Sequence, residues 1–163
     1  MTRITKSGFT LTELMLTVVI VGIMGGLTIA TVVGMRYKDA LTRATQQVYD
    51  DLILIRSQAV STSKTHRIRF ISDTSWVLEY YNTDLSTPAW VEKSSTRTMP
   101  GSTNLMSGSL TNAGSNLEST SRGIFQFQNG ATGSPYVSIE TQGVTQTKSI
   151  YVYTGGAIEI QTQ

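Results

Sequence analysis

The sequence predicts an α+β protein in which one long N-terminal α-helix packs on a C-terminal antiparallel β-sheet domain. Three observations lead to this fold. Residues 9–62 contain no proline and carry an apolar run followed by an apolar stripe with helical spacing. From residue 64 onward, short segments rich in β-branched and aromatic residues alternate with turn signals. The length of 163 residues allows one domain with an extension, and the absence of cysteine excludes disulfides and thiol chemistry.

The charge balance gives little indication of a nucleic-acid partner. Charged residues make up 15% of the chain, and the formal net charge is +2. Removal of residues 1–8 would take away Arg3 and Lys6 and leave 11 basic against 11 acidic side chains. A chain balanced in this way has no net attraction for polyanions. A periplasmic location stays open, because disulfides are permitted there but not required.

The first part of the predicted helix, residues 9–35, is apolar on all sides. Its stretch from Met15 to Met35 holds 21 uncharged residues, and a membrane-spanning helix needs about 20. We therefore expect a transmembrane or filament-core helix. Its N-terminus should be cytoplasmic, because Arg3 and Lys6 precede it without an acid. Glycines at 22, 25, 26 and 34 indicate either close helix packing or ordinary glycine use in a membrane helix.

The second part of the helix, residues 36–63, is amphipathic. Apolar residues recur every three or four positions, at Tyr37, Leu41, Ala44, Val48, Leu52, Ile55 and Ala59. Such a stripe needs an apolar partner, and the β-rich domain at residues 64–163 can supply it. Hairpin signals at Asn129-Gly130 and Thr154-Gly155-Gly156, together with short connections, predict an antiparallel sheet. Residues 94–122 are rich in Ser, Thr, Asn and Gly and should form a polar surface loop with one or two short strands.

No catalytic or metal-binding pattern stands out, so we expect no enzymatic activity and no cofactor. His66 is the only histidine, and its neighbours Arg67 and Arg69 would repel a metal cation, so an exposed strand histidine is expected. Asp50 and Asp51 point apart on a helix, which favours a solvated helix face over a catalytic pair. Lys64, Arg67 and Arg69 form the densest basic cluster; we expect a solvated sheet face, with weak DNA or surface contact as the alternative.

Glu13 is the only charged residue between Phe9 and Met35. A carboxylate within a membrane costs about 2.5–3.5 kcal/mol on insertion scales. Either Glu13 lies close enough to the surface to reach water, or it has a cationic partner within an assembly. The nearest positive charge in the chain, Lys6, is seven residues away. We therefore expect a specific partner for Glu13 that the newly synthesised chain does not itself supply.

The stretch Lys6-Ser7-Gly8-Phe9-Thr10-Leu11-Thr12-Glu13-Leu14, followed by an apolar run, resembles the class III signal of type IV pilins and type II secretion pseudopilins. In that family, prepilin peptidase cuts after the glycine and methylates the new amine. The resemblance implies that residues 1–8 are a leader peptide, that the cut falls between Gly8 and Phe9, and that Phe9 is methylated. It also implies that the amine of Phe9, in the same or the next subunit, pairs with Glu13.

The resemblance extends to the minor-pilin and pseudopilin group known as GspH/FimT. Its long helix carries a stretch similar to residues 51–60, and its β-rich domain ends in a strand, a turn and a strand like Ile150 to Ile160. This implies a pilin-like structural subunit that helps to initiate or prime a filament. It would sit in the bacterial inner membrane with its C-terminal domain in the periplasm, and then join the filament. The implied partners are other pilin or pseudopilin subunits, prepilin peptidase and the inner-membrane assembly platform.

Two departures from the family pattern are informative. Ala30 stands where major pilins usually carry a proline, so no kink is predicted there. Some FimT-like proteins bind DNA through basic residues of the final hairpin, whereas residues 155–159 here contain none. A filament-displayed DNA- or surface-binding receptor is thus the second hypothesis, and a membrane-anchored periplasmic enzyme the third. The sequence does not separate a type IV pilus from a type II secretion system.

Overall fold

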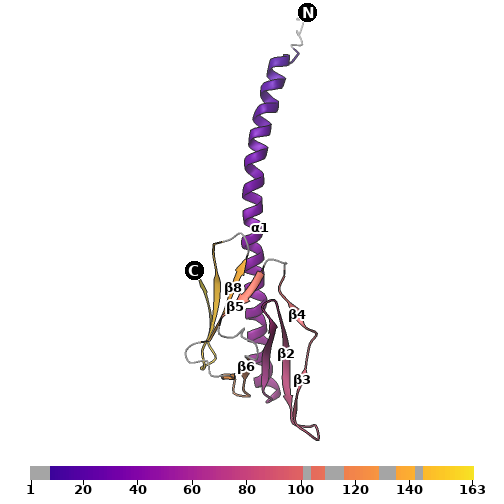
Figure 1. The fold of residues 1–163 in the computed structure, drawn as a ribbon, viewed down its shortest axis with the longest axis vertical. Coiled ribbons are helices and arrows are strands. Elements are labelled where there is room, and N and C mark those ends of the chain that lie inside the picture. The colour runs from indigo at the N-terminus through magenta and orange to yellow at the C-terminus, as the bar shows by residue number, and fades with distance from the viewer. Residues whose placement is uncertain (1–7, 101–103, 109–115, 129–134, 142–144) are drawn as a thin grey trace, which may run out of the picture. The chain divides into compact units, whose positions relative to one another are not determined.

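The computed structural model describes residues 8–100, 104–108, 116–128, 135–141 and 145–163, without the side chains of residues 27–33, 104, 105 and 128. The chain divides into two compact units, Met1–Arg36 and Tyr37–Gln163. Helix α1, Leu11–Thr62, contributes its first part to one unit and its second part to the other (Figure 1). The two units are described separately below.

In the first unit, the large apolar side chains of α1 that the structure describes are exposed. The large apolar residues between Leu11 and Met24 are 47–76% exposed. Ideal Cβ atoms built on Gly22, Gly25, Gly26 and Gly34 meet no other atom within 4 Å. Within the described part of the chain, no helix is sufficiently long and apolar to cross a membrane. Of the predicted leader, residues 1–7 lie outside the described part.

In the second unit, α1 buries the predicted stripe. Leu41, Ala44, Val48, Leu52, Ile55 and Ala59 are each at most 1% exposed. The helix ends at Thr62, and the next residue, Ser63, has a positive φ of 55°. A left-handed residue directly after the last turn is a common way for a helix to stop. The spacing of the apolar residues therefore correctly predicted which face of the helix is buried.

The first sheet has the strand order β3-β2-β1-β6-β7, and β4 pairs with β2. Its strands are β1 His66–Ser72, β2 Ser75–Asn82, β3 Ala89–Glu92, β4 Arg97–Thr98, β6 Asn116–Ser119 and β7 Phe125–Gln128. Side chains of β1 alternate: Ile68 and Phe70 are buried, whereas Arg67 and Arg69 are half-buried. This period of two places the apolar residues toward α1 and the arginines on the other face of the sheet.

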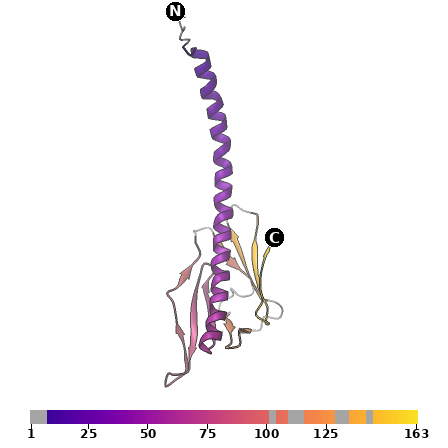
Figure 2. The same cartoon turned by 180° about the vertical axis from the view of Figure 1, so that it is seen from behind.

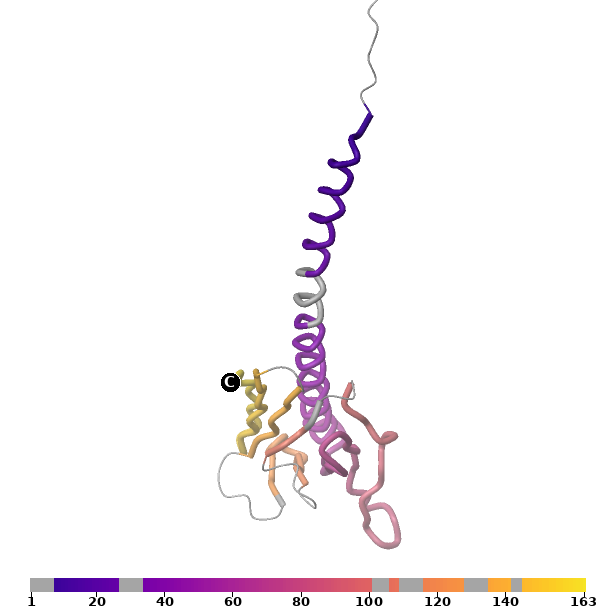
Figure 3. The backbone as a smooth tube through the Cα atoms, turned by 45° about the horizontal axis from the view of Figure 1, so that its top comes forward, coloured from indigo at the N-terminus to yellow at the C-terminus, as the bar shows by residue number. Residues whose placement is uncertain are grey.

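The second sheet has the order β10-β9-β8-β5. Its strands are β5 Asn104–Ser107, β8 Tyr136–Thr141, β9 Lys148–Val152 and β10 Ile158–Thr162. Every strand pair in both sheets is antiparallel, as expected from the short connections. Seen from behind, the second part of α1 passes in front of both sheets (Figure 2). The yellow C-terminal strands β9 and β10 lie side by side in the tube view (Figure 3).

One core joins the helix to both sheets. It contains Val48 and Ile55 of α1, Trp76 of β2, and Ile139 and Ile150 of the second sheet. Arg56 adds a polar connection on the neighbouring helix face, because its Nε donates to the carbonyl oxygen of Gly123 at 3.1 Å. The predicted arrangement of a long helix packed on an antiparallel β domain is confirmed.

Three local expectations differ from the structure. Residues 94–122, expected to be a polar loop, contribute β4, β5 and β6, and β6 lies between β1 and β7. Leu117 of β6 is fully buried opposite Ile68 of β1. A single apolar residue thus anchors this strand, which is too short to show the alternation of apolar and polar residues that identifies a strand in a sequence. His66 was expected to be exposed but is 2% exposed, because it starts β1 on the face that carries Ile68.

Asp51 is the third difference. The two adjacent acids were expected to share a solvated helix face, and Asp50 is indeed exposed. Asp51 is only 2% exposed. Its carboxylate accepts a hydrogen bond of 2.7 Å from Trp76 Nε1 and pairs with Arg97 at 3.0 Å. Burial raises the pKa of Asp51, although the bond from Trp76 and the charge of Arg97 oppose this shift.

Candidate processing and assembly site

The segment around the predicted cut lies before the helix. Gly8, Phe9 and Thr10 have no regular secondary structure, and α1 begins at Leu11. Phe9 is 84% exposed. Gly8, Phe9, Thr10 and Glu13 surround one open pocket of about 390 Å³. The Gly8–Phe9 peptide bond is therefore exposed and outside the hydrogen-bonded helix.

Thr10 and Glu13 together cap the N-terminus of α1. The Thr10 hydroxyl accepts from the amide of Glu13 at 3.3 Å, and the Glu13 carboxylate accepts from the amide of Thr10 at 3.1 Å. The Thr10 hydroxyl also lies within hydrogen-bond distance, 3.0 Å, of the same carboxylate oxygen. This reciprocal arrangement is a capping box, which satisfies two amide groups that a helix start otherwise leaves without partners.

The capping role of Glu13 was not predicted, although the sequence contains a signal for it. The pattern Thr10-Leu11-Thr12-Glu13 is the Thr-x-x-Glu signature that precedes an apolar helix. A carboxylate in the first turn is also favoured by the positive end of the helix dipole. Among the described residues, no basic side chain forms an ion pair with Glu13. The hydrogen bonds of the helix start are thus its partners within the described part of the chain.

The predicted basic cluster is neutralised by carboxylates. Lys64 pairs with Asp84 at 2.6 Å. On the opposite face of the sheet from α1, Arg67 and Arg69 both pair with Glu79, at 2.5 and 2.8 Å. Arg69 further reaches Glu92 at 3.4 Å, and the guanidinium carbon of Arg67 lies 3.9 Å from the centre of the Trp90 ring.

Glu79 is the centre of this network. Its side chain is 5% exposed, and burial alone would raise its pKa. Hydrogen bonds from Arg69 and Arg67 outweigh burial, so the pKa of Glu79 is lowered from its ordinary value. The structure therefore brings Arg67 and Arg69 together around an ionised carboxylate and places Lys64 in a separate pair. The three residues do not form a free basic patch.

Comparison with known proteins identifies two similarities. Residues 3–29 match the family model described as the prokaryotic N-terminal methylation motif. The structure resembles the minor pseudopilin EpsH from the type 2 secretion system of Vibrio cholerae, with a TM-score of 0.57 and 14% identity over 74% of this chain and 95% of that chain. The chain has a pilin-like fold.

A second solved structure gives the same result. The type IV minor pilin FimU of Pseudomonas aeruginosa has a TM-score of 0.56 and 14% identity over 76% of the pilin-like chain and 90% of its own. A search of curated proteins gives no match. The motif and the fold together support the predicted type IV minor pilin or pseudopilin. Both matched structures are of minor pilins or pseudopilins.

Proposed function

We propose that this chain is a minor pilin or pseudopilin that is cut between Gly8 and Phe9, methylated at Phe9, and assembled through its N-terminal helix. The observation that carries the proposal is the helix start. The Gly8–Phe9 bond is exposed, it precedes a capped helix, and it lies within the matched motif at residues 3–29. In a type IV pilus or a type II secretion pseudopilus, such a subunit would help to initiate or prime the filament.

Before assembly, the subunit would be held in the bacterial inner membrane by residues 9–35, with its β-rich domain in the periplasm. The uncharged run from Met15 to Met35 supports this location. So do the exposed apolar side chains of α1 between Leu11 and Met24, because an apolar surface of this extent requires lipid or protein to cover it. In the filament, the helices of neighbouring subunits would take the place of lipid.

Cleavage would create a cationic partner for Glu13. In the precursor, the nitrogen of Phe9 is an uncharged amide. After the cut it becomes an amine, one residue before the Thr10 amide that already lies 3.1 Å from the Glu13 carboxylate. The amine of the same subunit, or of the next one, could then pair with Glu13. A subunit docked out of register would leave this charge unpaired, so the pair would select the correct register.

Mass spectrometry of the assembled protein tests the proposal. We expect a chain that begins at an N-methylated Phe9 when prepilin peptidase is active, and a chain that begins at Met1 when the peptidase is inactivated. Gly8→Val should block the cut, because a branched side chain would occupy the scissile position, whereas Gly22→Ala should not affect it. An assembled subunit that retains Met1 would refute the proposal.

The alternative of a DNA- or surface-binding receptor on the filament finds less support. The basic residues that would form its surface are largely engaged: Lys64, Arg67, Arg69 and Arg97 each pair with a carboxylate. Phosphate binding by these side chains would have to compete with ion pairs that are already formed.

A further inference from the structure

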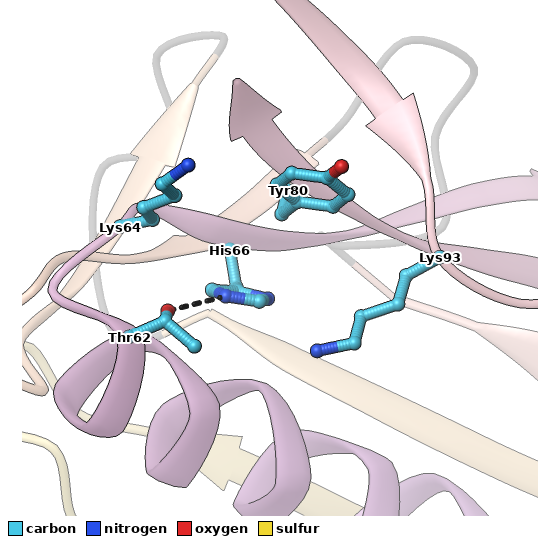
Figure 4. A pocket seen from close by; sticks show the side chains of 5 residues that line it. All are labelled: Thr62, Lys64, His66, Tyr80 and Lys93. Atoms are coloured by element: carbon cyan, nitrogen blue, oxygen red, sulfur yellow. Dashed lines mark hydrogen bonds between the residues drawn. The ribbon is translucent and has the colours of Figure 1, made fainter. Parts of the chain in front are cut away.

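A small pocket lies between the last turn of α1 and the adjoining ends of strands β1 and β2 in the first sheet. It has a volume of about 340 Å³ and is lined by Thr62, Lys64, His66, Tyr80 and Lys93. Figure 4 shows His66 and Tyr80 on neighbouring strands, Thr62 at the end of the helix below them, and Lys93 extending beneath the His66 ring. This site belongs to the β-rich domain and does not involve the processing segment.

The strand register explains why these residues meet. His66 is opposite Tyr80 in the β1–β2 pair, and their ring centres are 6.0 Å apart. Lys93 follows β3, and its backbone amide donates to the carbonyl oxygen of Leu78 at 2.9 Å. Leu78 and Tyr80 are two residues apart on β2, so they share the face that α1 covers. Because the helix ends at Thr62, the face beyond its end is left open as a pocket.

The pocket holds one cation without a charged partner. Lys64 is occupied by Asp84 at 2.6 Å. The His66 ring shares a hydrogen bond of 3.0 Å with the Thr62 hydroxyl. Burial, and secondarily the nearby charge of Lys93, lower the pKa of His66, which keeps its ring neutral near pH 7. Within the described ranges, the exposed ammonium of Lys93 forms no ion pair.

We propose that this pocket binds a carboxylate carried on a side chain of a partner polypeptide. The single negative charge of a carboxylate matches the single ammonium of the pocket that forms no ion pair among the described residues. The Thr62 hydroxyl donates to the carbonyl oxygen of Gln58 at 2.7 Å, so it accepts from His66 Nε2–H, and the other ring nitrogen, once protonated, can donate to a bound carboxylate. The Tyr80 ring and the lysine stems provide apolar walls that suit the hydrocarbon stem of a glutamate.

His66 reports on occupancy because it is the only histidine in the chain. A carboxylate bound beside it would oppose the effect of Lys93 and raise the pKa of its ring. The full-length protein, purified in neutral detergent micelles without a histidine tag and labelled with ¹⁵N at histidine, would give one pair of imidazole signals. These signals can be followed during titration with the peptide acetyl-Ala-Glu-Ala-amide, with acetyl-Ala-Gln-Ala-amide as the uncharged control.

We expect a saturable shift of the imidazole signals and a higher His66 pKa with the glutamate peptide, and neither with the glutamine peptide. Lys93→Gln should weaken binding about tenfold, the effect of one lost ion pair of ordinary strength. Lys93→Arg should retain binding, which separates loss of charge from misfolding. Lys38→Gln removes the same charge from an exposed position on α1 and should leave affinity unchanged.

Two further ligands distinguish the sources of the negative charge. Acetyl-Ala-Ala-Ala with a free C-terminus offers a backbone carboxylate, and weaker binding than the glutamate peptide is expected if the partner group is a side chain. Inorganic phosphate at the same ionic strength tests the other anion class. Tighter binding of phosphate, equal binding of the glutamine peptide, or full affinity in Lys93→Gln would each overturn the proposal.

Discussion

Glu13 combines two properties that different substitutions can separate. Its carboxylate accepts a hydrogen bond from the Thr10 amide at the start of α1. It is also the only charged group in residues 9–35. Glutamine keeps an acceptor at this position of a capping box but carries no charge. Alanine removes both properties. Thr10→Ala removes the reciprocal hydroxyl and leaves the charge.

We therefore expect Glu13→Gln to insert and fold normally but to fail to enter filaments, because its uncharged amide cannot pair with the Phe9 amine. Glu13→Ala should fail as well and should also weaken the helix start. Thr10→Ala should show only the weaker helix start, at a cost of about 0.5–2 kcal/mol for the loss of its N-cap residue. Sheared filaments and membrane fractions, compared by immunoblot, provide the measurement. Incorporation of Glu13→Gln at the wild-type level would show that the charge is dispensable.

Glu79 allows a second test, of domain stability. Glu79→Gln breaks a buried pair with two arginines and should lower the free energy of unfolding by about 1.5–3 kcal/mol near pH 7. Glu92→Gln is the control, because its carboxylate is 61% exposed and lies 3.4 Å from Arg69, so a change of less than about 1 kcal/mol is expected. Denaturant unfolding followed by tryptophan fluorescence would measure both changes.

The pH dependence of this effect has a definite sign. Because the pKa of Glu79 is lower in the folded protein than its ordinary 4.5, its stabilisation is complete above that value and is lost as the pH falls through the lowered pKa. The difference between the wild type and Glu79→Gln should therefore shrink at acidic pH. Asp51 and Glu118 have pKa values raised by burial and act in the opposite direction. Asp51 should do so equally in both proteins, whereas Glu118 also faces the charge of Arg67. A difference that grew on acidification would contradict this account.

Single residues also show which features are predictable from a sequence. The motif that matches at residues 3–29 was predictable because its residue types stand at fixed spacing within one local stretch. The cut after Gly8 and the methylation of Phe9 stay predictions. The burial of Asp51 was not, because its partners Trp76 and Arg97 lie 25 or more residues away along the chain. Likewise, Glu79 meets Arg67 and Arg69 only through the pairing of β1 with β2. Ion pairs across strands depend on a register that no local pattern specifies.

At the scale of elements, long periodic segments were predicted well and short ones were not. The stripe on α1 recurs over six turns, so its buried face followed from spacing alone. Strand β6 has four residues, of which Leu117 is the only apolar one. Its place in the middle of the first sheet depends on pairing with β1 and β7, and not on its own composition.

The turn between β9 and β10 provides a test at this scale. Gly156 has a φ of +92°, and a Cβ built there would lie 2.8 Å from Arg56 Cζ and from the carbonyl oxygen of Gly123. Gly156→Ala should therefore destabilise the domain by at least about 1–2 kcal/mol, the cost of a left-handed residue with a side chain. Gly155→Ala is the adjacent control, because its Cβ would meet nothing within 4 Å. Equal melting temperatures for the two variants would mean that the contact with Arg56 relaxes freely.

At the scale of the molecule, the buried core lies entirely within the second unit. Its residues run from Leu41 to Val152, whereas the described large apolar side chains of the first unit are exposed. A segment with its own core can fold alone. We therefore expect residues 37–163, expressed without the apolar run, to be a cooperatively folding protein. Its unfolding temperature should match that of the full chain in detergent, and a broad transition would contradict this expectation.

The same fragment tests the receptor alternative. Because the strongest basic cluster is paired with Glu79, Glu92 and Asp84, the fragment should not retard duplex DNA in a gel at moderate salt. Glu79→Gln would remove the shared partner of Arg67 and Arg69, leave Arg69 only its exposed contact with Glu92, and serve as a positive comparison, since weak, salt-dependent retardation should then appear. Clear retardation by the unmodified fragment would restore the receptor as the leading function.

The capping box at Thr10 also determines what kind of substrate the precursor presents. Proteases act most readily on exposed, irregular chain, and a helix that grew by one more turn toward the N-terminus would enclose the Gly8–Phe9 bond in its hydrogen bonds. Thr10 prevents this growth, because its hydroxyl and the Glu13 carboxylate fix Leu11 as the first helical residue. The carboxylate that we propose to guide docking after the cut thus also keeps the Gly8–Phe9 bond outside the helix before it.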